Sequence, residues 1–193
     1  VASTMEKHHQ VQILDEALEA SVKLSHRYIP ARQLPDKSVS LLDTACARVA
    51  ISLHAVPAEV DDSRRRIEAL ETELQIIARE HAIGIAIGAR QSNSEALLSA
   101  ERERLASLES RWAEEKTLVD ELLATRATLR EKAGVVDSGN DELRAKLVDL
   151  QQRLSALQGE TPLILPTVDY QAVASVVADW TGIPVGRMAR NEL

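Results

Sequence analysis

Apolar residues recur at helical spacing along three successive stretches in the middle of the chain. The first series, with steps of three and four residues, comprises Ile67, Leu70, Leu74 and Ile77. The second comprises Leu98, Leu105, Leu108, Trp112, Val119, Leu122 and Leu129, and the third Leu143, Leu147, Leu150, Leu154 and Leu157. Because such spacing lines one side of a helix with apolar side chains, the pattern predicts three antiparallel segments of a protruding coiled-coil arm.

Glycines mark the places where the predicted arm reverses direction. The segment 81–88 alternates isoleucine with smaller residues, which mimics a short strand, but Gly84 and Gly88 favour a turn or helix break. Gly134 and Gly139 mark the second reversal. A middle helix over residues 95–132 would be about 57 Å long at ~1.5 Å per residue.

Residues 1–57 predict a small helical domain. Asp15 can cap a helix that Pro30 ends. A loop follows, and Pro35 suits the first turn of a second helix that runs to about His54. Two such helices bury too little to be stable alone, so we expect them to pack on something else. The apolar positions of the first helix include Leu18, Val22 and Leu24.

Residues 161–193 predict an extended segment followed by a helix. Two prolines preclude helix at the start and leave a linker, or at most a short strand near 163–168. Asp169 can cap the helix, and Gly182 and Pro184 stop it. Its apolar positions include Val173, Val176, Val177 and Trp180.

Composition supports a helical chain and narrows the function classes. Of the 193 residues, 2% are aromatic and none is Phe, with 7 Gly and 6 Pro, so sheet-rich folds are disfavoured and an all-α fold is predicted. The net charge is −7, and residues 58–160 hold most of it, which favours treating them as a separate domain. With no basic cluster beyond residues 64–66, we expect no nucleic-acid partner.

The chain has no apolar run of membrane-spanning length and opens with no signal peptide. We therefore expect no membrane partner and a cytoplasmic protein. The first residue, Val1, suggests a segment excised from a longer protein.

Residues for catalysis or metal binding are not assembled in this sequence. It lacks the phosphate-loop pattern G-x-x-x-x-G-K-[ST], the pattern G-x-G-x-x-G and any cysteine pair. His8 and His9 would point about 100° apart on a helix and do not easily share one metal ion. Cys46 follows a helical apolar pattern and is interpreted as a buried small hydrophobe. We expect neither a catalytic residue nor a metal ligand in this segment.

Two stretches resemble the Clp family of AAA+ unfoldases. Residues 8–48, which include Leu-Pro-Asp-Lys at 34–37, resemble the small helical lid of the first ATPase domain. Residues 178–188, Ala-Asp-Trp-Thr-Gly-Ile-Pro-Val-Gly-Arg-Met, are similar to the segment that enters the second ATPase domain. The order of lid, arm and entry segment fits the ClpB and ClpV branch. Ser-Leu-Leu-Asp-Thr-Ala-Cys-Ala-Arg-Val-Ala at 40–50, and the short arm, resemble ClpV.

The resemblance implies three parts and a function of the parent protein. Residues 1–57 would be the lid, 58–160 the coiled-coil middle domain, and 161–193 the linker and entry segment. ClpV proteins of type VI secretion are hexameric rings that use ATP to disassemble the contracted sheath of VipA and VipB. The Walker motifs and the sheath-binding domain are not in this sequence, so we expect an interaction and coupling element, with no ATPase activity of its own.

The resemblance also implies two nucleotide edges. Pro35 and Asp36 match residues that lie beside the adenine and ribose in the first ATPase domain. Ile183, Pro184 and Val185 match residues that line the adenine pocket of the second, although as a bare tail they would be disordered. Without the phosphate-binding halves, we expect no tight binding of ATP.

Partners of the arm follow from the same resemblance. It implies contacts with neighbouring arms and with the first ATPase ring of a homohexamer, and sheath contacts through regions absent here. Arg126 and His81 interrupt the apolar seams and could set the helix register. Two alternatives remain open: the middle of a ClpB-like disaggregase, whose arm also receives Hsp70, and a stand-alone coiled-coil adaptor.

Overall fold

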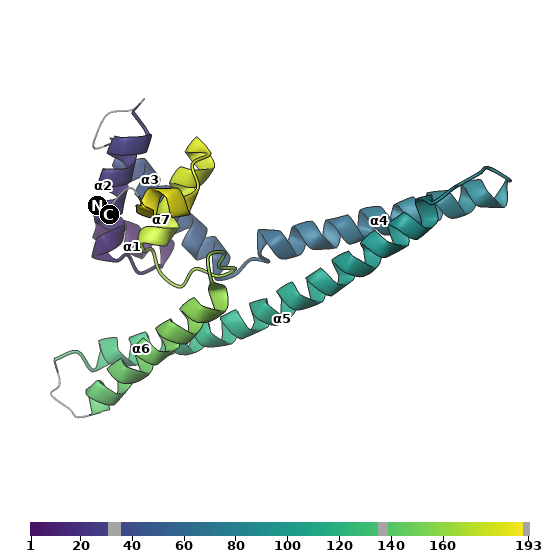
Figure 1. Cartoon of the computed structure of the whole chain (residues 1–193). Helices are drawn as coiled ribbons and strands as arrows, with labels where there is room; N and C mark the ends of the chain where they lie inside the picture. The colour runs from purple at the N-terminus through teal and green to yellow at the C-terminus, as the bar shows by residue number, and fades with distance from the viewer. Residues whose placement is uncertain (31–35, 135–138, 191–193) are drawn as a thin grey trace. The chain divides into compact units, whose positions relative to one another are not determined.

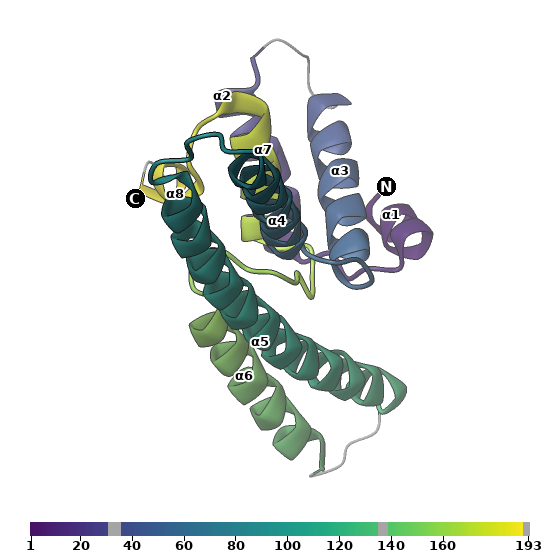
Figure 2. The same cartoon turned by 90° about the vertical axis from the view of Figure 1, so that its right-hand side faces the viewer.

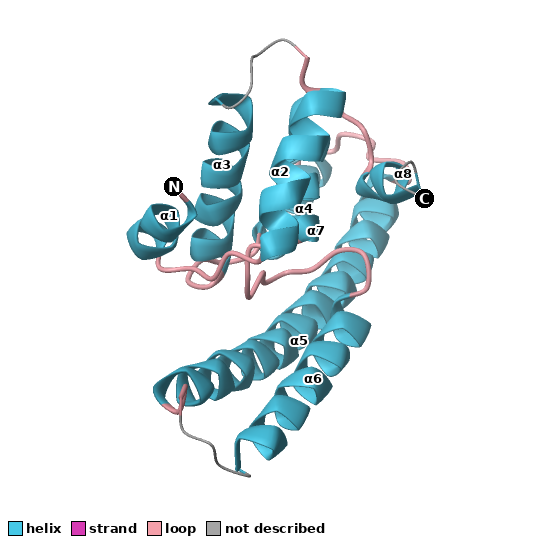
Figure 3. Cartoon of the chain, turned by 90° about the vertical axis from the view of Figure 1, so that its left-hand side faces the viewer, coloured by secondary structure: helices cyan, strands magenta, loops and turns pink. Residues whose placement is uncertain are grey.

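The computed structural model describes residues 1–30, 36–134 and 139–190. Over these ranges the regular elements are all helices, and the sole strand-like feature is an isolated parallel bridge between Ile13 and Val168 (Figure 3). The predicted all-α fold is confirmed, and the strand allowed near 163–168 is reduced to that bridge. The chain forms two compact units, Val1–Ala55 with Ile164–Leu193, and Val56–Leu163. The functional division at residues 57 and 160 stays a prediction.

The first unit brings the two ends of the chain together. It contains the helices α1 (Ala2–His9), α2 (Asp15–Tyr28), α3 (Asp36–Ser52), α7 (Tyr170–Thr181) and α8 (Val185–Arg190). Helix α7 packs against both α2 and α3, α1 lies beside α3, and α8 packs on α7 (Figures 2 and 3). The expectation that the first two predicted helices need support from elsewhere is confirmed, since α7 supplies it.

Small residues form much of the core of this unit. Helix α2 buries Ala17, Ala20, Ser21, Leu24 and Ser25, whereas Val22 is 46% exposed, so the predicted apolar face was wrong at that position. On α7, the three predicted valines have no exposed surface. Trp180 is 43% exposed, which corrects its assignment to the buried face. The small side chains on α2 let the helices approach closely.

The two predicted helix caps have different outcomes. Asp169 is the N-cap of α7, and its carboxylate accepts a hydrogen bond from the backbone N–H of Ala172 at 2.8 Å. Leu14, not Asp15, is the N-cap of α2. The reason is the bridge, since the N–H of Leu14 donates to the carbonyl of Val168 at 2.9 Å and holds this residue extended. Asp15 instead lies in the first turn, where its charge complements the helix dipole.

Cys46 is a fully buried core residue of α3, as predicted. Burial, with smaller contributions from the charges of Asp43 and Glu6, raises the pKa of its thiol from 9.0 to about 11. The folded state therefore keeps this proton at a pH where the unfolded chain has lost it.

We expect the first unit to lose stability as the pH rises from 9.0 to about 11. The contribution of the thiol is fully present below pH 9.0, the pKa of the unfolded chain, and is lost as the pH rises through the folded value. Over this range the wild type should lose about 2 kcal/mol more than a Cys46→Ala variant. Urea unfolding of both proteins at several pH values measures this, and parallel pH profiles would contradict it.

The second unit is a long two-lobed coiled coil. It consists of α4 (Ala58–Ala82), α5 (Arg90–Glu131) and α6 (Gly139–Gln158). The 42 residues of α5 extend about 63 Å at ~1.5 Å per residue. Helix α4 runs antiparallel along its N-terminal half and α6 along its C-terminal half (Figure 1). Each lobe is thus two helices thick, and α5 is the spine that both share.

The predicted reversals and seams are confirmed where the structure describes them. Residues 83–89 form a turn, and Gly84 and Gly88 have φ angles of 83° and 54°, which suit glycine. At the second reversal α5 ends at Glu131 and α6 begins at Gly139, with residues 135–138 outside the described ranges. The apolar positions of all three series are buried or half-buried. The most buried seam residues are Ile77, Leu98, Val119, Leu122, Leu150 and Leu154.

Candidate functional site

The first predicted nucleotide edge lies at the start of α3. Asp36 is its first described residue and is exposed, while Pro35 lies outside the described residues. Lys37 is 6% exposed, and its Nζ donates to the carbonyl oxygen of Ile29 at 3.2 Å. This contact, which the sequence pattern did not indicate, ties the start of α3 to the end of α2. The carboxylate of Asp36 remains open to solvent, and its contact with nucleotide stays a prediction.

The second predicted edge is an ordered turn between α7 and α8. Gly182 ends α7 with a φ of 76°, and the carbonyl of Pro184 accepts a hydrogen bond from the N–H of Arg187 at 3.0 Å. Ile183 and Val185 are half-buried against the core. The expectation of a disordered tail was wrong, because these two side chains and the fully buried Met188 dock on the first unit. Pro184 itself is exposed.

Metal and membrane sites find no support in the described part of the chain. Among those residues, no group of three or more His, Cys, Asp and Glu side chains is placed to hold a metal ion. The Nε2 atom of His9 instead lies 2.8 Å from Oδ1 of Asp43, which joins α1 to α3. No described helix combines the length and apolar character needed to cross a membrane.

Arginine–glutamate pairs connect α4 to α5. The Nη2–Oε1 distances are 3.0 Å for Arg64–Glu109, for Arg102–Glu71 and for Arg90–Glu73. These side chains are about half exposed, so each pair adds little free energy. Because α4 contributes an arginine near its start and glutamates further along, while α5 contributes the opposite charges, the pairs nevertheless favour one antiparallel register. Arg126 is half-buried and His81 exposed, and their role in register stays a prediction.

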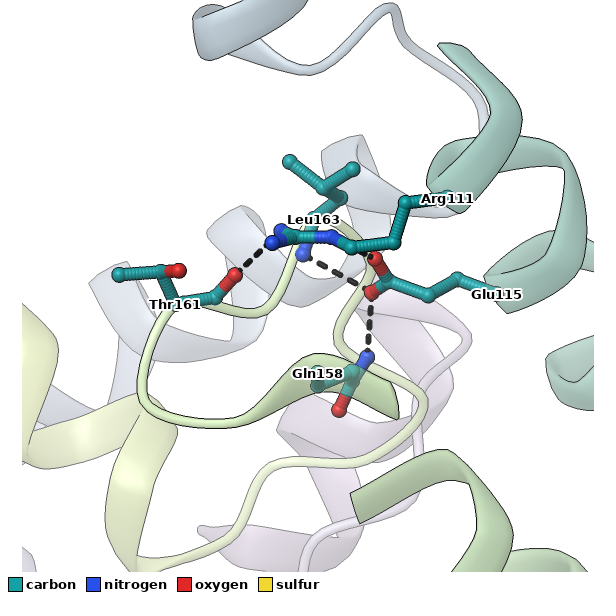
Figure 4. Close-up of polar contacts among 5 residues, drawn as sticks. All are labelled: Arg111, Glu115, Gln158, Thr161 and Leu163. Carbon is teal, nitrogen blue, oxygen red and sulfur yellow. Dashed lines mark hydrogen bonds and ion pairs between the residues drawn. The ribbon is translucent and has the colours of Figure 1, made fainter. Parts of the chain in front are cut away.

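A polar network lies at the middle of α5 and was not predicted. Glu115 has no exposed surface. Its Oε1 accepts hydrogen bonds from Nε2 of Gln158 at 2.8 Å and from the backbone N–H of Leu163 at 2.9 Å (Figure 4). Its Oε2 accepts from Nε of Arg111 at 2.9 Å, and the same guanidinium donates to the carbonyl of Thr161. The network joins α5 to the end of α6 and to the segment that follows.

The sequence does contain a signal for this network. Residue 115 lies three positions after Trp112 and four before Val119, both members of the second apolar series. A glutamate at such a position faces the neighbouring helix and needs partners for its charge. The pattern alone does not distinguish Glu115, because glutamates are abundant on the exposed faces of the same helix.

The arm ends in an apolar turn. Around it, Ile83 is 77% exposed, Leu97 60%, Ile85 46% and Ile76 41%. Exposed apolar side chains clustered at one end of a charged rod are typical of a surface that contacts a partner.

Comparison with known proteins identifies the family. The model of the AAA lid domain matches residues 1–97. The AAA+ ATPase ClpV1 of Pseudomonas aeruginosa is 76% identical over 208 aligned positions, which include 100% of this chain and 23% of that protein. The chaperone protein ClpB of Yersinia enterocolitica is 40% identical and aligns with 98% of this chain and 22% of its own length. The chain thus spans about a quarter of these curated relatives.

One solved structure also aligns with most of the chain. The S. cerevisiae Hsp104–ADP complex covers 96% of this chain and 29% of its own at 26% identity, with a TM-score of 0.49, too low to bear on the fold. The family match covers half of the chain, and the identity to ClpV1 extends over all of it. The chain therefore belongs to the AAA lid domain family, and over its whole length it is similar to ClpV and ClpB proteins.

Proposed function

We propose that this chain is the lid and middle-domain segment of a ClpV-type AAA+ ATPase, in which it couples ATP turnover to remodelling of the type VI secretion sheath. The observation that carries the proposal is the 76% identity to ClpV1, which extends over both units. The 40% identity to a ClpB chaperone is lower over nearly the same residues. The difference favours a ClpV-type parent over a ClpB-type disaggregase, and family membership disfavours a stand-alone adaptor.

The structure supports a coupling role for the arm. Helix α5 is about 63 Å long and belongs to both lobes. It can therefore transmit a displacement of the arm's tip to the residues at which the chain enters and leaves the arm. Its charged faces and its exposed tip isoleucines suit contacts with other proteins. We propose that these are neighbouring arms and the first ATPase ring of a homohexamer. Contacts with VipA and VipB would come from regions outside this sequence.

The nucleotide edges complete the proposal. In the parent, Pro35 and Asp36 would border the adenosine of the first ATPase domain. Ile183, Pro184 and Val185 would border the adenine of the second, where a proline turn between two apolar side chains suits packing against a base. No phosphate-binding motif accompanies either edge in this sequence.

We expect the 193-residue chain to show no binding of ATP in a calorimetric titration, because the sequence lacks the phosphate-loop motif whose backbone N–H groups and lysine bind the phosphates. The same titration on the complete ATPase is the positive control. Micromolar affinity of the chain alone would contradict the assignment of these residues as edges of sites built elsewhere.

A segment exchange tests the proposed function. The matching segment of P. aeruginosa ClpV1 is replaced by this chain, and ATP-driven disassembly of VipA/VipB sheaths is measured. The control is the same exchange with the matching segment of Y. enterocolitica ClpB. We expect sheath disassembly with this chain and little with the ClpB segment. A chimera that hydrolyses ATP but does not disassemble sheaths would contradict the proposal, and disaggregase activity of this chain within ClpB would favour the alternative.

A further inference from the structure

Residues 159–163 leave the arm without regular secondary structure, and we name them the exit strap. Gly159 ends α6 with a φ of 58°, and Leu163 is the last residue of the second unit. The N–H of Gly159 still donates to the carbonyl of Ser155 at 3.1 Å, but the helix does not continue beyond it, so side chains of other elements help to define the path of the strap. Two side chains of α5, those of Glu115 and Arg111, do so in the structure (Figure 4).

The contacts are matched in chemistry as well as in distance. In these contacts with α5 the N–H of Leu163 is the donor and the carbonyl of Thr161 is the acceptor. The carboxylate of Glu115 accepts a hydrogen bond from this N–H, and the guanidinium of Arg111 donates one to this carbonyl. Glu115 and Arg111 also pair with each other, one helical turn apart on the same face of α5. Their ion pair thus orients Glu115 toward the N–H of Leu163 and Arg111 toward the carbonyl of Thr161.

Burial makes this arrangement selective for one position of the exit strap. Glu115 is fully buried and Leu163 is 5% exposed. A buried carboxylate is tolerated only while its hydrogen bonds and its charge partner are in place. If the exit strap moves away, Glu115 loses the N–H of Leu163 and that N–H loses its acceptor. Partial detachment of the exit strap therefore costs free energy twice, at the carboxylate of Glu115 and at the N–H of Leu163.

We propose that Glu115 and Arg111 form a latch that fixes the exit strap to the middle of α5, so that the two lobes and the departing chain move as one body. The latch lies where both lobes meet α5, since Glu109 pairs with the start of α4 and Gln158 belongs to the end of α6. A displacement of either tip then reaches residue 163 without being absorbed in the exit strap. The use of the latch to transmit displacement rests on the proposed coupling function, but the latch itself is a property of this chain.

Hydrogen exchange of the 193-residue chain tests the latch. In Glu115→Gln an amide NH2 group replaces one carboxylate oxygen, and this donor then faces either Arg111 or the two donors on the other side. We expect the amide of Leu163 to exchange about 10-fold faster or more, as for the loss of one charge-assisted hydrogen bond. Amides in the middle of α6 should change less than about two-fold. The matched control is Glu114→Gln, at an exposed neighbouring position, with no effect at Leu163.

A second variant separates a latch from general stabilisation of the arm. Arg111→Lys keeps the charge but cannot hold Glu115 and the carbonyl of Thr161 with one planar group. It should open the exit strap in the same local pattern. Unchanged exchange at Leu163 in both variants would overturn the latch, and so would equal loss of protection along all of α5 and α6. Either result leaves the segment exchange with ClpV1 unaffected, so failure of the latch and failure of the proposed function are distinguishable.

Discussion

We expect Val177→Asp to unfold the first unit and leave the arm folded. Val177 has no exposed surface and lies on α7, which packs against both α2 and α3. An unpaired carboxylate there costs about 3–5 kcal/mol. That cost is comparable with the whole stability of a small domain, about 5–15 kcal/mol. Because α7 is the element that joins the other helices, its loss removes the core they share.

The control for this variant is Val22→Asp, which places the same charge on α2 at a side chain that is 46% exposed. It should change the free energy of unfolding by less than about 0.5 kcal/mol. Circular dichroism gives the stability of each variant, and hydrogen exchange assigns the loss to peptides of one unit. If Val177→Asp leaves α2 and α3 protected, α7 is not the support that the packing indicates. If the arm loses protection too, the two units are not independent.

Periodicity predicted the arm well because each of its helices buries a stripe of apolar side chains that recurs at regular spacing. A helix such as α5 offers many equivalent positions, so a run of leucines at heptad spacing outweighs any single exception. The two ends of α7 were predicted for a different reason. Asp169 and Gly182 each satisfy a local backbone requirement, a cap for the first N–H groups and a positive φ, that depends on few neighbours.

The core of the first unit was harder to predict because its packing is set by distant segments. Ala17, Ala20 and Ser21 are buried on α2 although their side chains are small. The hydrophobicity of Val22 predicted that this residue would face the core, but it is exposed. Which face of α2 turns inward depends on α7, about 150 residues later in the chain. Val168, in the segment just before α7, explains the bridge at Ile13 and the displaced N-cap at Leu14.

Polar residues of the candidate sites show a second limit of sequence patterns. The motif around Lys37 indicated a family but not that this lysine would be buried against a carbonyl of α2. Glu115 differs from the neighbouring Glu114 only by one position, yet one is buried and the other exposed. The difference follows from helix geometry once the seam is known. Its partner Leu163 could not be found in the same way, because the exit strap follows no periodic pattern.

The second large effect is expected at the seam between α5 and α6. Leu122→Ala should lower the free energy of unfolding of the arm by about 2–5 kcal/mol, because it removes buried methyl groups and leaves a cavity. Leu122 is 1% exposed. The matched control is Leu97→Ala, on the same helix but 60% exposed, which should change stability by less than about 0.5 kcal/mol. Urea unfolding of both variants, followed by circular dichroism, measures the difference.

The location of the loss is as informative as its size. Leu122 lies in the half of α5 that α6 covers, so exchange in the Leu122→Ala variant should increase first in α6. Helix α4, which packs on the other half of α5, should keep its protection. Equal effects of the two leucine substitutions would contradict the assigned seam. Simultaneous loss of protection in α4 and α6 would instead show that α5 unfolds as one unit. In that case both lobes depend on each other, and damage to either lobe would uncouple the whole arm.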